Sequence, residues 1–552
     1  MANEESEEQR KLSLKIARLF DEVWTSQAAH VRKLKELVSL RSSSPPAEFC
    51  EAFCRALTPL FNFQRRTASA ERIIKFAAVF ACSRGGKGNS GDEFLENFLK
   101  FLLVGAAAAN KTVRFRACQI VSEIIMRLPD DAEVSNELWD EVIECMRLRV
   151  ADKVPAVRTF AVRALARFAN DSENGDVLEL FLERLPVEQN GDVRKIIVLS
   201  LPPSSATLPM IFDCTLDVNE SVRKAAYSVL AWICVCACIL CVNAAIFKFC
   251  LSIKHRTNIL QRGLTDRSTA VAKDCVKLLK DEWLEKCCNG DPVELLKFLD
   301  VETYESVGEL VMTTLLKAGL VKMQNGQTIR KFLISNVDLA EGGHFNHSIE
   351  LMDPEVALFW RMVCKHLHRE ANTKGSDAAM TMGTESVVYA AEASDNNDLL
   401  DSILPASVSE YVELVNAHIA AGANYRFVSR QLLLLGAMLD FSDASKRKVA
   451  SEFVQNLLHK AIDHELDDNG NEVFIGDGLN LGGERDWAAA VAELAKKVHA
   501  AIGSLKRLFL QWWKSLLLAT ALSSAALSCC DCTAFGEHNF ISSYAGKGHR
   551  PC

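Results

Sequence analysis

Apolar residues recur along most of the chain at the spacing of an amphipathic helix. One face collects Val113, Ala117, Ile120, Val121 and Ile124. The same steps recur from Val157 to Phe168. Steps of three and four residues keep side chains on one side of a helix, whereas a half-buried strand alternates every second residue. No stretch alternates in that way, so the pattern predicts an all-α protein with almost no sheet.

The helical pattern is organised as an internal repeat. Four segments share a polar turn, a Val, a basic residue and then a helix. Their Val residues, Val113, Val157, Val193 and Val222, are separated by 44, 36 and 29 residues, and a looser copy starts at Asp266. Such periods are typical of helix pairs of the HEAT or armadillo type, which must stack because one pair cannot bury its apolar face alone. The sequence therefore predicts a HEAT-repeat α-solenoid, a curved superhelix of antiparallel helix pairs.

An acid precedes an Arg by six residues in three of these repeats. The pairs are Asp152 with Arg158, Glu188 with Arg194, and Asp217 with Arg223. The acid lies in the predicted turn and the Arg in the first turn of the second helix. Stacking could join these groups into a ladder of charge-assisted hydrogen bonds between repeats. Arg114 has Ala108 at the acid position, so we expect it to lack that partner.

Shifts in composition divide the chain into segments. Residues 373–401 are rich in Ser, Thr, Asp, Asn and Ala, and residues near 464–485 are rich in Gly and Asp, so both are predicted to be loops. The expected segments are N-terminal HEAT repeats over 10–231, an apolar Cys-rich insertion over 232–251, HEAT repeats over 252–372, a polar linker over 373–401, further helical repeats over 402–503, and an atypical tail over 504–552.

Composition and charge limit the classes of function. The 552 residues are 49% hydrophobic with a net charge of −8, which excludes a uniformly basic nucleic-acid protein and confines any DNA contact to a local basic stripe. The apolar run from Val229 to Phe247 is long enough to span a membrane. Because the flanking sequence reads as one helical repeat, we favour a protein without a membrane span.

Each candidate motif for catalysis or metal binding lacks a residue that its chemistry requires. The Gly-rich stretch from Arg84 fails as a phosphate loop because Gly88 follows Lys87 where Ser or Thr is required. A calcium loop near Glu465 would carry Gly476 at the position of its bidentate Glu. Cys238 and its neighbours lack a second ligand pair at zinc spacing. We therefore expect no enzyme activity, no cofactor, no metal and no small-molecule substrate.

The repeats, taken in order, resemble the CAP-G family, the non-SMC HEAT-repeat subunits of mitotic condensin. The resemblance rests on NKTVRFRACQIVSEI, MRLRVADKVPAVRTFAVRALARF, DVRKIIVLSLPPSSATLPMI and LDVNESVRKAAYSVLA, and resumes at SIKHRTNILQRGLTDRS, MDPEVALFWRMVCKHL, SILPASVSEYVELV and SRQLLLLGAMLDFSD. Trp232–Cys250 and the tail after Gly503 depart from the family, and family members are longer. These departures suggest a truncated or mispredicted gene model.

The resemblance implies a function and partners. It implies a non-catalytic condensin subunit that binds the condensin kleisin, and through the kleisin the SMC ATPase pair. It also implies non-specific duplex DNA binding for chromosome condensation in mitosis and cell division, with the protein in the nucleus, on mitotic chromosomes and in a cytoplasmic pool. The alternative is a generic HEAT adaptor scaffold that binds only proteins.

Basic residues left over once the ladder is assigned are the candidates for DNA contact. A basic residue that recurs in each repeat would form a stripe that can follow a phosphate backbone. The candidates are Arg65, Arg66, Arg114, Arg116, Arg147, Arg149, Lys153, Lys195 and Lys224.

Overall fold

The computed structural model divides the chain into two units, Met1–Asn289 and Gly290–Cys552. The described residues are 7–28, 30–64, 66–83, 93–129, 134–169, 175–240, 251–321, 328–335, 347–441, 443–460, 465–466, 472–473 and 481–498. The phosphate-loop-like stretch 84–92, residues 241–250 of the predicted insertion, and the tail from residue 499 lie outside this part of the chain.

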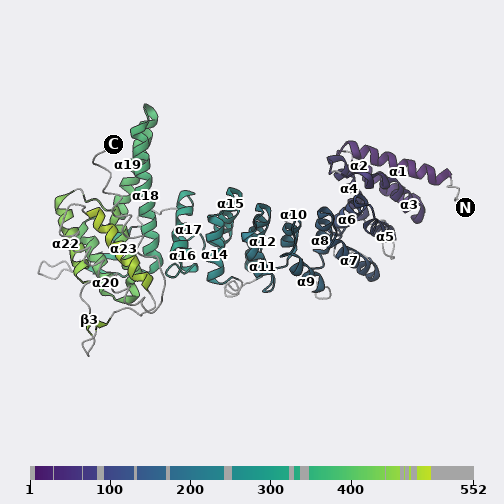
Figure 1. Cartoon of the computed structure of the whole chain (residues 1–552). Helices are drawn as coiled ribbons and strands as arrows, with labels where there is room; N and C mark the ends of the chain where they lie inside the picture. The colour runs from purple at the N-terminus through teal and green to yellow at the C-terminus, as the bar shows by residue number, and fades with distance from the viewer. Residues whose placement is uncertain are drawn as a thin grey trace, which may run out of the picture. The chain divides into compact units, whose positions relative to one another are not determined.

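The first unit is a succession of helices (Figure 1). They are α1 (Glu7–Thr25), α2 (His30–Ser43), α3 (Pro46–Leu57), η1 (Thr58–Asn62), α4 (Ala68–Ala81), α5 (Glu93–Ala106), α6 (Lys111–Ile125), α7 (Asn136–Val150), α8 (Pro155–Leu165), α9 (Gly175–Arg184), α10 (Gly191–Ser200), α11 (Leu208–Asp213), η3 (Cys214–Leu216), α12 (Glu220–Leu240), α14 (Ile253–Leu264), α15 (Thr269–Lys277) and the π-helical η4 (Leu278–Cys287).

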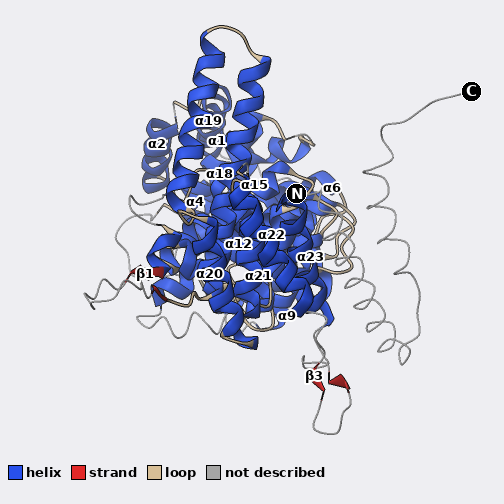
Figure 2. Cartoon of the chain, turned by 90° about the vertical axis from the view of Figure 1, so that its left-hand side faces the viewer, coloured by secondary structure: helices blue, strands red, loops and turns tan. Residues whose placement is uncertain are grey.

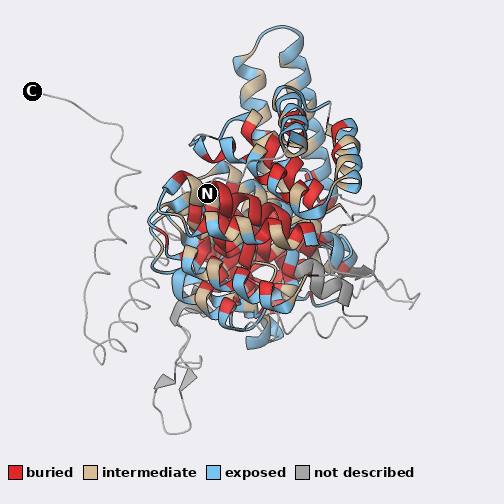
Figure 3. Ribbon diagram, turned by 90° about the vertical axis from the view of Figure 1, so that its right-hand side faces the viewer, coloured by how far each residue is buried: buried red, intermediate tan, exposed pale blue. Residues whose placement is uncertain are grey.

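The second helices of successive pairs form one layer of this unit. Helix α8 packs against α6 and α10, and α12 packs against α10 and α15, while α5 and α7 meet in the other layer. The predicted Val residues Val113, Val157, Val193 and Val222 each stand third in α6, α8, α10 and α12. Most apolar positions at helical spacing are buried, as Ala117, Ile120 and Leu165 are, whereas Val113 and Phe168 are half-buried. Figure 3 shows buried residues gathered in the interior, with exposed residues on the outside. The predicted all-α HEAT-repeat solenoid is therefore confirmed.

Polar turn residues fix where the second helices begin. The Asn110 side chain accepts a hydrogen bond from Thr112 N at the start of α6, and Asn190 does the same at the start of α10. Ser268 caps α15 in this way, whereas α8 begins with Pro155. A side-chain acceptor satisfies a backbone N–H that the helix leaves unpaired, and Pro at the first position has no N–H to satisfy. The repeat turn is thus encoded locally.

The second unit is also helical, with two short hairpins (Figure 2). It contains α16 (Pro292–Phe298), α17 (Glu305–Lys317), η5 (Ile329–Phe332), β1 (Leu333–Ser335), β2 (His347–Ile349), α18 (Pro354–Met380), α19 (Thr384–Ile403), α20 (Val408–Ala420), η6 (Ala423–Tyr425), α21 (Arg426–Leu435), η7 (Gly436–Met438), α22 (Ala444–Lys460), β3 (Glu465–Leu466), β4 (Glu472–Val473) and α23 (Leu481–Val498). Strand β1 pairs antiparallel with β2, placing Leu333 opposite Ile349, and β3 pairs antiparallel with β4.

The structure contradicts one predicted loop. Residues 373–401 were predicted to be a polar linker, yet they lie in α18 and α19, which pack together as an antiparallel hairpin. The segment contains no Pro, its Ala residues favour helix, and Gly383 with φ of 80° provides the turn. The segment lacks an apolar stripe, and the prediction of a linker was wrong because a helix does not require one.

The start of the predicted insertion continues a repeat helix. Helix α12 runs through Trp232 and Ile233 to Leu240, and the Ile233 side chain is buried. None of the helices in the described part of the chain combines the length and apolarity that a membrane crossing requires.

Candidate nucleic-acid interface

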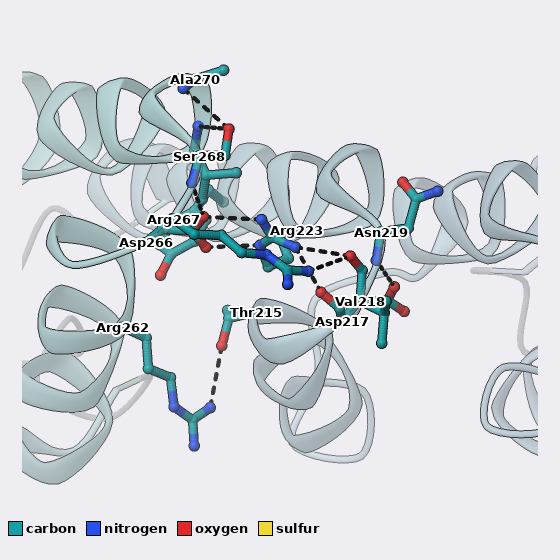
Figure 4. Close-up of polar contacts among 12 residues, drawn as sticks. Thr215, Asp217, Val218, Asn219, Arg223, Arg262, Asp266, Arg267, Ser268 and Ala270 are labelled. Atoms are coloured by element: carbon teal, nitrogen blue, oxygen red, sulfur yellow. Dashed lines mark hydrogen bonds and ion pairs between the residues drawn. The ribbon is translucent and has the colours of Figure 1, made fainter.

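Arg223 shows how the charged groups of neighbouring repeats are joined (Figure 4). Its Nε and Nη2 donate to the two carboxylate oxygens of Asp266 at 2.7 and 2.9 Å. Its Nη1 donates to the carbonyl oxygens of Asp217 at 2.8 Å and Val218 at 3.2 Å. Asp266 Oδ1 also accepts from Ser268 N at 2.7 Å. One guanidinium therefore ties the start of α12 to the turn before α15.

The same arrangement recurs along the first unit. Arg194 donates to Asp217 at 2.7 and 2.8 Å, Arg158 to Glu188 at 2.8 and 2.6 Å, and Arg114 to Asp152 at 2.7 and 3.2 Å. Each Arg reaches the acid of the following repeat. The residue six positions earlier contributes only its backbone carbonyl, as Asp152 does to Arg158 at 2.8 Å. We call these four bidentate pairs the ladder.

The structure contradicts the expectation for Arg114. We expected it to lack a ladder partner because Ala108 stands six residues before it. A backbone carbonyl is available whatever the side chain, and Arg114 Nη1 donates to Ala108 O at 3.1 Å while the acid comes from the next repeat. Arg114 is thus the first arginine of the ladder rather than a free cation.

The ladder acids are held in their charged form. Burial raises the pKa of Asp266, but the hydrogen bonds from Arg223 and Ser268 N more than offset this, so its pKa lies below its ordinary value. The pKa values of Asp152, Glu188 and Asp217 are lowered by the same balance. Hydrogen bonds to a carboxylate favour ionisation. The ladder is therefore a set of permanent ion pairs near neutral pH.

Arg116 belongs to an internal network that is linked through Gln119 and Glu71 to the exposed Arg66. Arg116 is fully buried, and it donates to Phe63 O at 2.9 Å and to Gln119 Oε1 at 2.7 Å. Arg66 donates to Glu71 at 3.0 Å, and Gln119 donates to the same carboxylate. A fully buried side chain cannot touch a phosphate, so the assignment of Arg116 to DNA is wrong. Arg65 lies outside the described residues.

Arg147 and Arg149 also have acidic partners. Arg147 forms an ion pair with Asp176, and Arg149 lies 3.5 Å from Asp152. Arg147 therefore has an acidic partner of its own, whereas Arg149 shares Asp152 with Arg114.

Three lysines of the predicted set are at least partly exposed. Lys153 is exposed in the turn before α8, and within the described residues it forms no ion pair. Lys195 on α10 is half-buried, and Lys224 on α12 lies 3.8 Å from Asp274. Lys195 and Lys224 each directly follow a ladder arginine.

The register of the ladder reveals a lysine that the sequence analysis missed. In α15 the ladder position is occupied by Ala272, and the next residue is Lys273, which is exposed. Lys195, Lys224 and Lys273 therefore hold the same position on α10, α12 and α15, which pack in one layer. We call these three residues the lysine row. Aligning the looser repeat at Asp266 with the others would have found Lys273.

The described residues offer no site for a metal. No group of three or more His, Cys, Asp or Glu side chains in that part of the chain could hold an ion.

The chain is similar in sequence to known condensin subunits. No protein-family model matches the chain. Condensin complex subunit 3 of Xenopus laevis is 29% identical over 462 residues, covering 81% of this chain and 41% of the relative. The Homo sapiens protein of the same name is 29% identical over 473 residues, covering 82% and 42%. That of Schizosaccharomyces pombe is 31% identical over 291 residues, covering 52% and 31%.

A solved structure agrees with these relatives. The crystal structure of the S. pombe condensin Cnd3–Cnd2 subcomplex contains a chain that matches with a TM-score of 0.67 at 22% identity, covering 92% of this chain and 57% of that one. This likeness establishes the fold. The chain spans about two fifths of the length of the frog and human relatives. The resemblance to the HEAT-repeat subunit of condensin that the ordered motifs indicated is thereby confirmed over most of the chain.

Proposed function

We propose that this chain is a non-catalytic HEAT-repeat subunit of the condensin complex. It binds a segment of the kleisin, reaches the SMC ATPase pair through it, and contacts duplex DNA without sequence specificity during mitotic chromosome condensation, in the nucleus and on mitotic chromosomes. The observation that carries the proposal is similarity to condensin complex subunit 3 over 81% of the chain. The stacked helix pairs support it, because solenoids offer extended surfaces to long partners.

The lysine row, together with Lys153, is the proposed DNA contact. The ladder uses the arginines of these repeats for structure, so the lysines beside it, of which Lys273 is exposed and Lys195 and Lys224 are half-buried, are the proposed cations for a phosphate. Lys195, Lys224 and Lys273 recur at one position of packed helices, which spaces them along a line. Phosphate contacts of this kind position DNA without reading bases.

Partner binding rests on a separate observation. The structural relative Cnd3 forms a subcomplex with Cnd2, a second condensin chain. By analogy, an extended kleisin segment would lie along the solenoid of this chain. DNA binding by this chain would then be strongest in the presence of that segment.

A salt titration of DNA binding tests the proposal. The variant Lys195→Glu/Lys224→Glu/Lys273→Glu removes three contacts, so the slope of log affinity against log salt should fall by roughly 3 units at about 0.9 per phosphate. Fluorescence anisotropy with a random-sequence duplex, with and without the kleisin segment, measures the slope. The matched control Lys35→Glu/Lys100→Glu/Lys254→Glu makes the same change in net charge at exposed lysines on other helices.

The two variants separate the proposal from its alternative. A reduced slope in the row variant and a much smaller change in the control support the lysine row. Equal slopes and affinities in wild type and both variants would remove the row from the DNA interface and favour a generic HEAT adaptor that binds only proteins.

A further inference from the structure

The α18–α19 hairpin carries an arm that extends beyond the other helices of its unit (Figures 1 and 2). We define the hairpin arm as residues 370–401. The base of the hairpin is anchored, because α18 packs on α17 and α21 and because Leu400 and Ile403 are buried. Beyond Ala371 and Leu400 the arm leaves this support, and its two helices contact mainly each other.

The hairpin arm has almost no core of its own. Between Asn372 and Leu399 the only buried residue is Ala393. The two helices are linked instead by the ion pair between Lys374 and Glu392 at 2.5 Å and by the Ser386 hydroxyl, which donates to Ala378 O at 2.7 Å. Most helical stability in proteins comes from packing of an apolar face. An arm with so little burial therefore gains substantially if a partner covers it.

Apolar side chains are exposed at the tip of the arm. Met380 and Met382 have relative exposures of 87% and 94%, and Val387 and Val388 follow near the start of α19 with 69% and 53%. These four exposed apolar residues lie within nine positions at one end of the hairpin, and such a concentration is typical of interaction sites. Methionine is flexible and polarizable, which suits it to adaptable binding surfaces. The tip has the composition of a contact site.

The hairpin arm is strongly acidic, which favours a basic partner. Within residues 370–401 there are seven acids and one base, a net charge of −6 compared with −8 for the whole chain. The acids are Glu370, Asp377, Glu385, Glu392, Asp395, Asp398 and Asp401. Such a field repels nucleic acid and attracts cations, and complementary charge both steers and selects a partner.

We propose that the hairpin arm binds a Lys/Arg-rich amphipathic segment of a partner protein. Apolar side chains of that segment cover Met380, Met382 and the two valines, while its cations lie along the acidic sides of α18 and α19. The apolar tip gives affinity and the acids give selectivity for a basic sequence. This role does not depend on the proposed function, because it involves neither the ladder nor the lysine row.

Two synthetic probes test the proposal on the full chain. One is a 20-residue peptide, about the length of the arm's helices, with Lys and Leu in amphipathic order, and the other replaces every Leu by Ser. Met380→Ser/Met382→Ser removes the apolar tip, and Asp395→Lys/Asp398→Lys reverses two exposed acids. Controls are Val31→Ser and Glu413→Lys, which change exposed residues elsewhere. Anisotropy gives affinity, and hydrogen exchange locates the peptide.

The expected pattern has three parts. The Lys–Leu peptide binds wild type and both controls alike, and it protects amides of residues 378–392 from exchange. Each arm variant weakens its binding about tenfold, the effect of losing one well-packed contact. The Lys–Ser peptide binds at least about tenfold more weakly than the Lys–Leu peptide, because it cannot cover the tip. Duplex DNA binding by the arm variants is unchanged, which separates this test from that of the proposed function.

Three outcomes would overturn the proposal. Equal affinity of the two peptides would reduce the arm to a general negative surface. Unchanged affinity in both arm variants, or protection elsewhere in the chain, would place binding at another site. Self-association of the wild-type chain that Met380→Ser/Met382→Ser abolishes would assign the tip to a second copy of this protein.

Discussion

Removing Arg223 tests whether the ladder holds neighbouring repeats together. Arg223→Met keeps the apolar stem and deletes the guanidinium, which donates two hydrogen bonds to Asp266 and one each to the carbonyls of Asp217 and Val218. The side chains of Arg223 and Asp266 have relative exposures of only 4% and 7%. Removing one partner of a buried pair costs about 3–5 kcal/mol, since it leaves an uncompensated charge. Asp266 keeps its bond from Ser268 N, so we expect about 3 kcal/mol.

Urea unfolding of the full chain, followed by far-ultraviolet circular dichroism, measures this loss. A repeat array is held together by interfaces between neighbours, so weakening one of them should also broaden or split the transition. Arg223→Lys should recover only part of the stability, because an ammonium cannot donate the parallel pair of bonds to the carboxylate and also reach both carbonyls. A double-mutant cycle with Asp266→Asn should give a coupling energy of about 2 kcal/mol.

The pH dependence provides a second measure of the same pair. The pKa of Asp266 is lowered in the folded chain, so the unfolded chain binds a proton at higher pH than the folded chain does. The contribution of the pair is therefore complete above the ordinary Asp value of 3.8 and is lost as the pH falls through the folded pKa. Arg223→Met should flatten this acid dependence. A loss below about 1 kcal/mol together with additivity in the cycle would refute the ladder as a stabilising element.

Two further predictions concern buried positions. His418 is buried, its Nε2 accepts a hydrogen bond from Met352 N at 2.9 Å, and burial lowers its pKa below the ordinary 6.5. The unfolded chain therefore takes up the proton first, and the stability of the fold should decrease as the pH drops below 6.5. His418→Gln should reduce the difference between the melting temperatures at about pH 7.5 and about pH 5.5, and an unchanged difference would contradict this reasoning. A Cβ at Gly263 would clash with Cys275 Sγ and Tyr227 Oη, where α14 packs against α12 and α15. Gly263→Ala should therefore lower the free energy of unfolding in urea by about 1–3 kcal/mol. In the control Gly175→Ala the added Cβ meets no atom, so the stability should not decrease.

The sequence was informative about the fold because one local pattern recurs, with variations, in successive repeats. The polar turn supplies a cap, the Val two residues into the helix faces the core, and the Arg after it reaches a carbonyl six residues back. All three features follow from Asn190, Val193 and Arg194 without knowledge of the rest of the chain. The helix starts could therefore be predicted from short windows, whereas the acid that completes each pair could not, because it lies 23 to 43 residues further along.

The candidate site was less predictable because exposure is a property of stacking. Arg116 and Lys195 are both basic residues near the start of a second helix, but Arg116 is buried under Phe63 and Gln119 whereas Lys195 remains half-exposed. The repeat register separates them in part, because Arg116 stands three residues after the repeat Val and Lys195 stands two, but the residues that cover Arg116 include one 53 positions away. The helices of the hairpin arm were missed for a different reason. Its helices bury too little for a periodic signal to exist.

Residue type explains which charges hold the solenoid and which remain available. Every cation of the ladder is an Arg, and every member of the lysine row is a Lys. A guanidinium presents a planar fork that matches a carboxylate and still has a donor for a carbonyl, while an ammonium keeps its hydration on a flexible stem. In α10 and α12 the structural role is filled by Arg and the next, half-buried position holds Lys, whereas in α6 and α8 that next position holds Phe115 and Thr159. In α10 and α12, the chemistry of the two side chains thus divides the basic charge between holding the repeats together and facing the solvent.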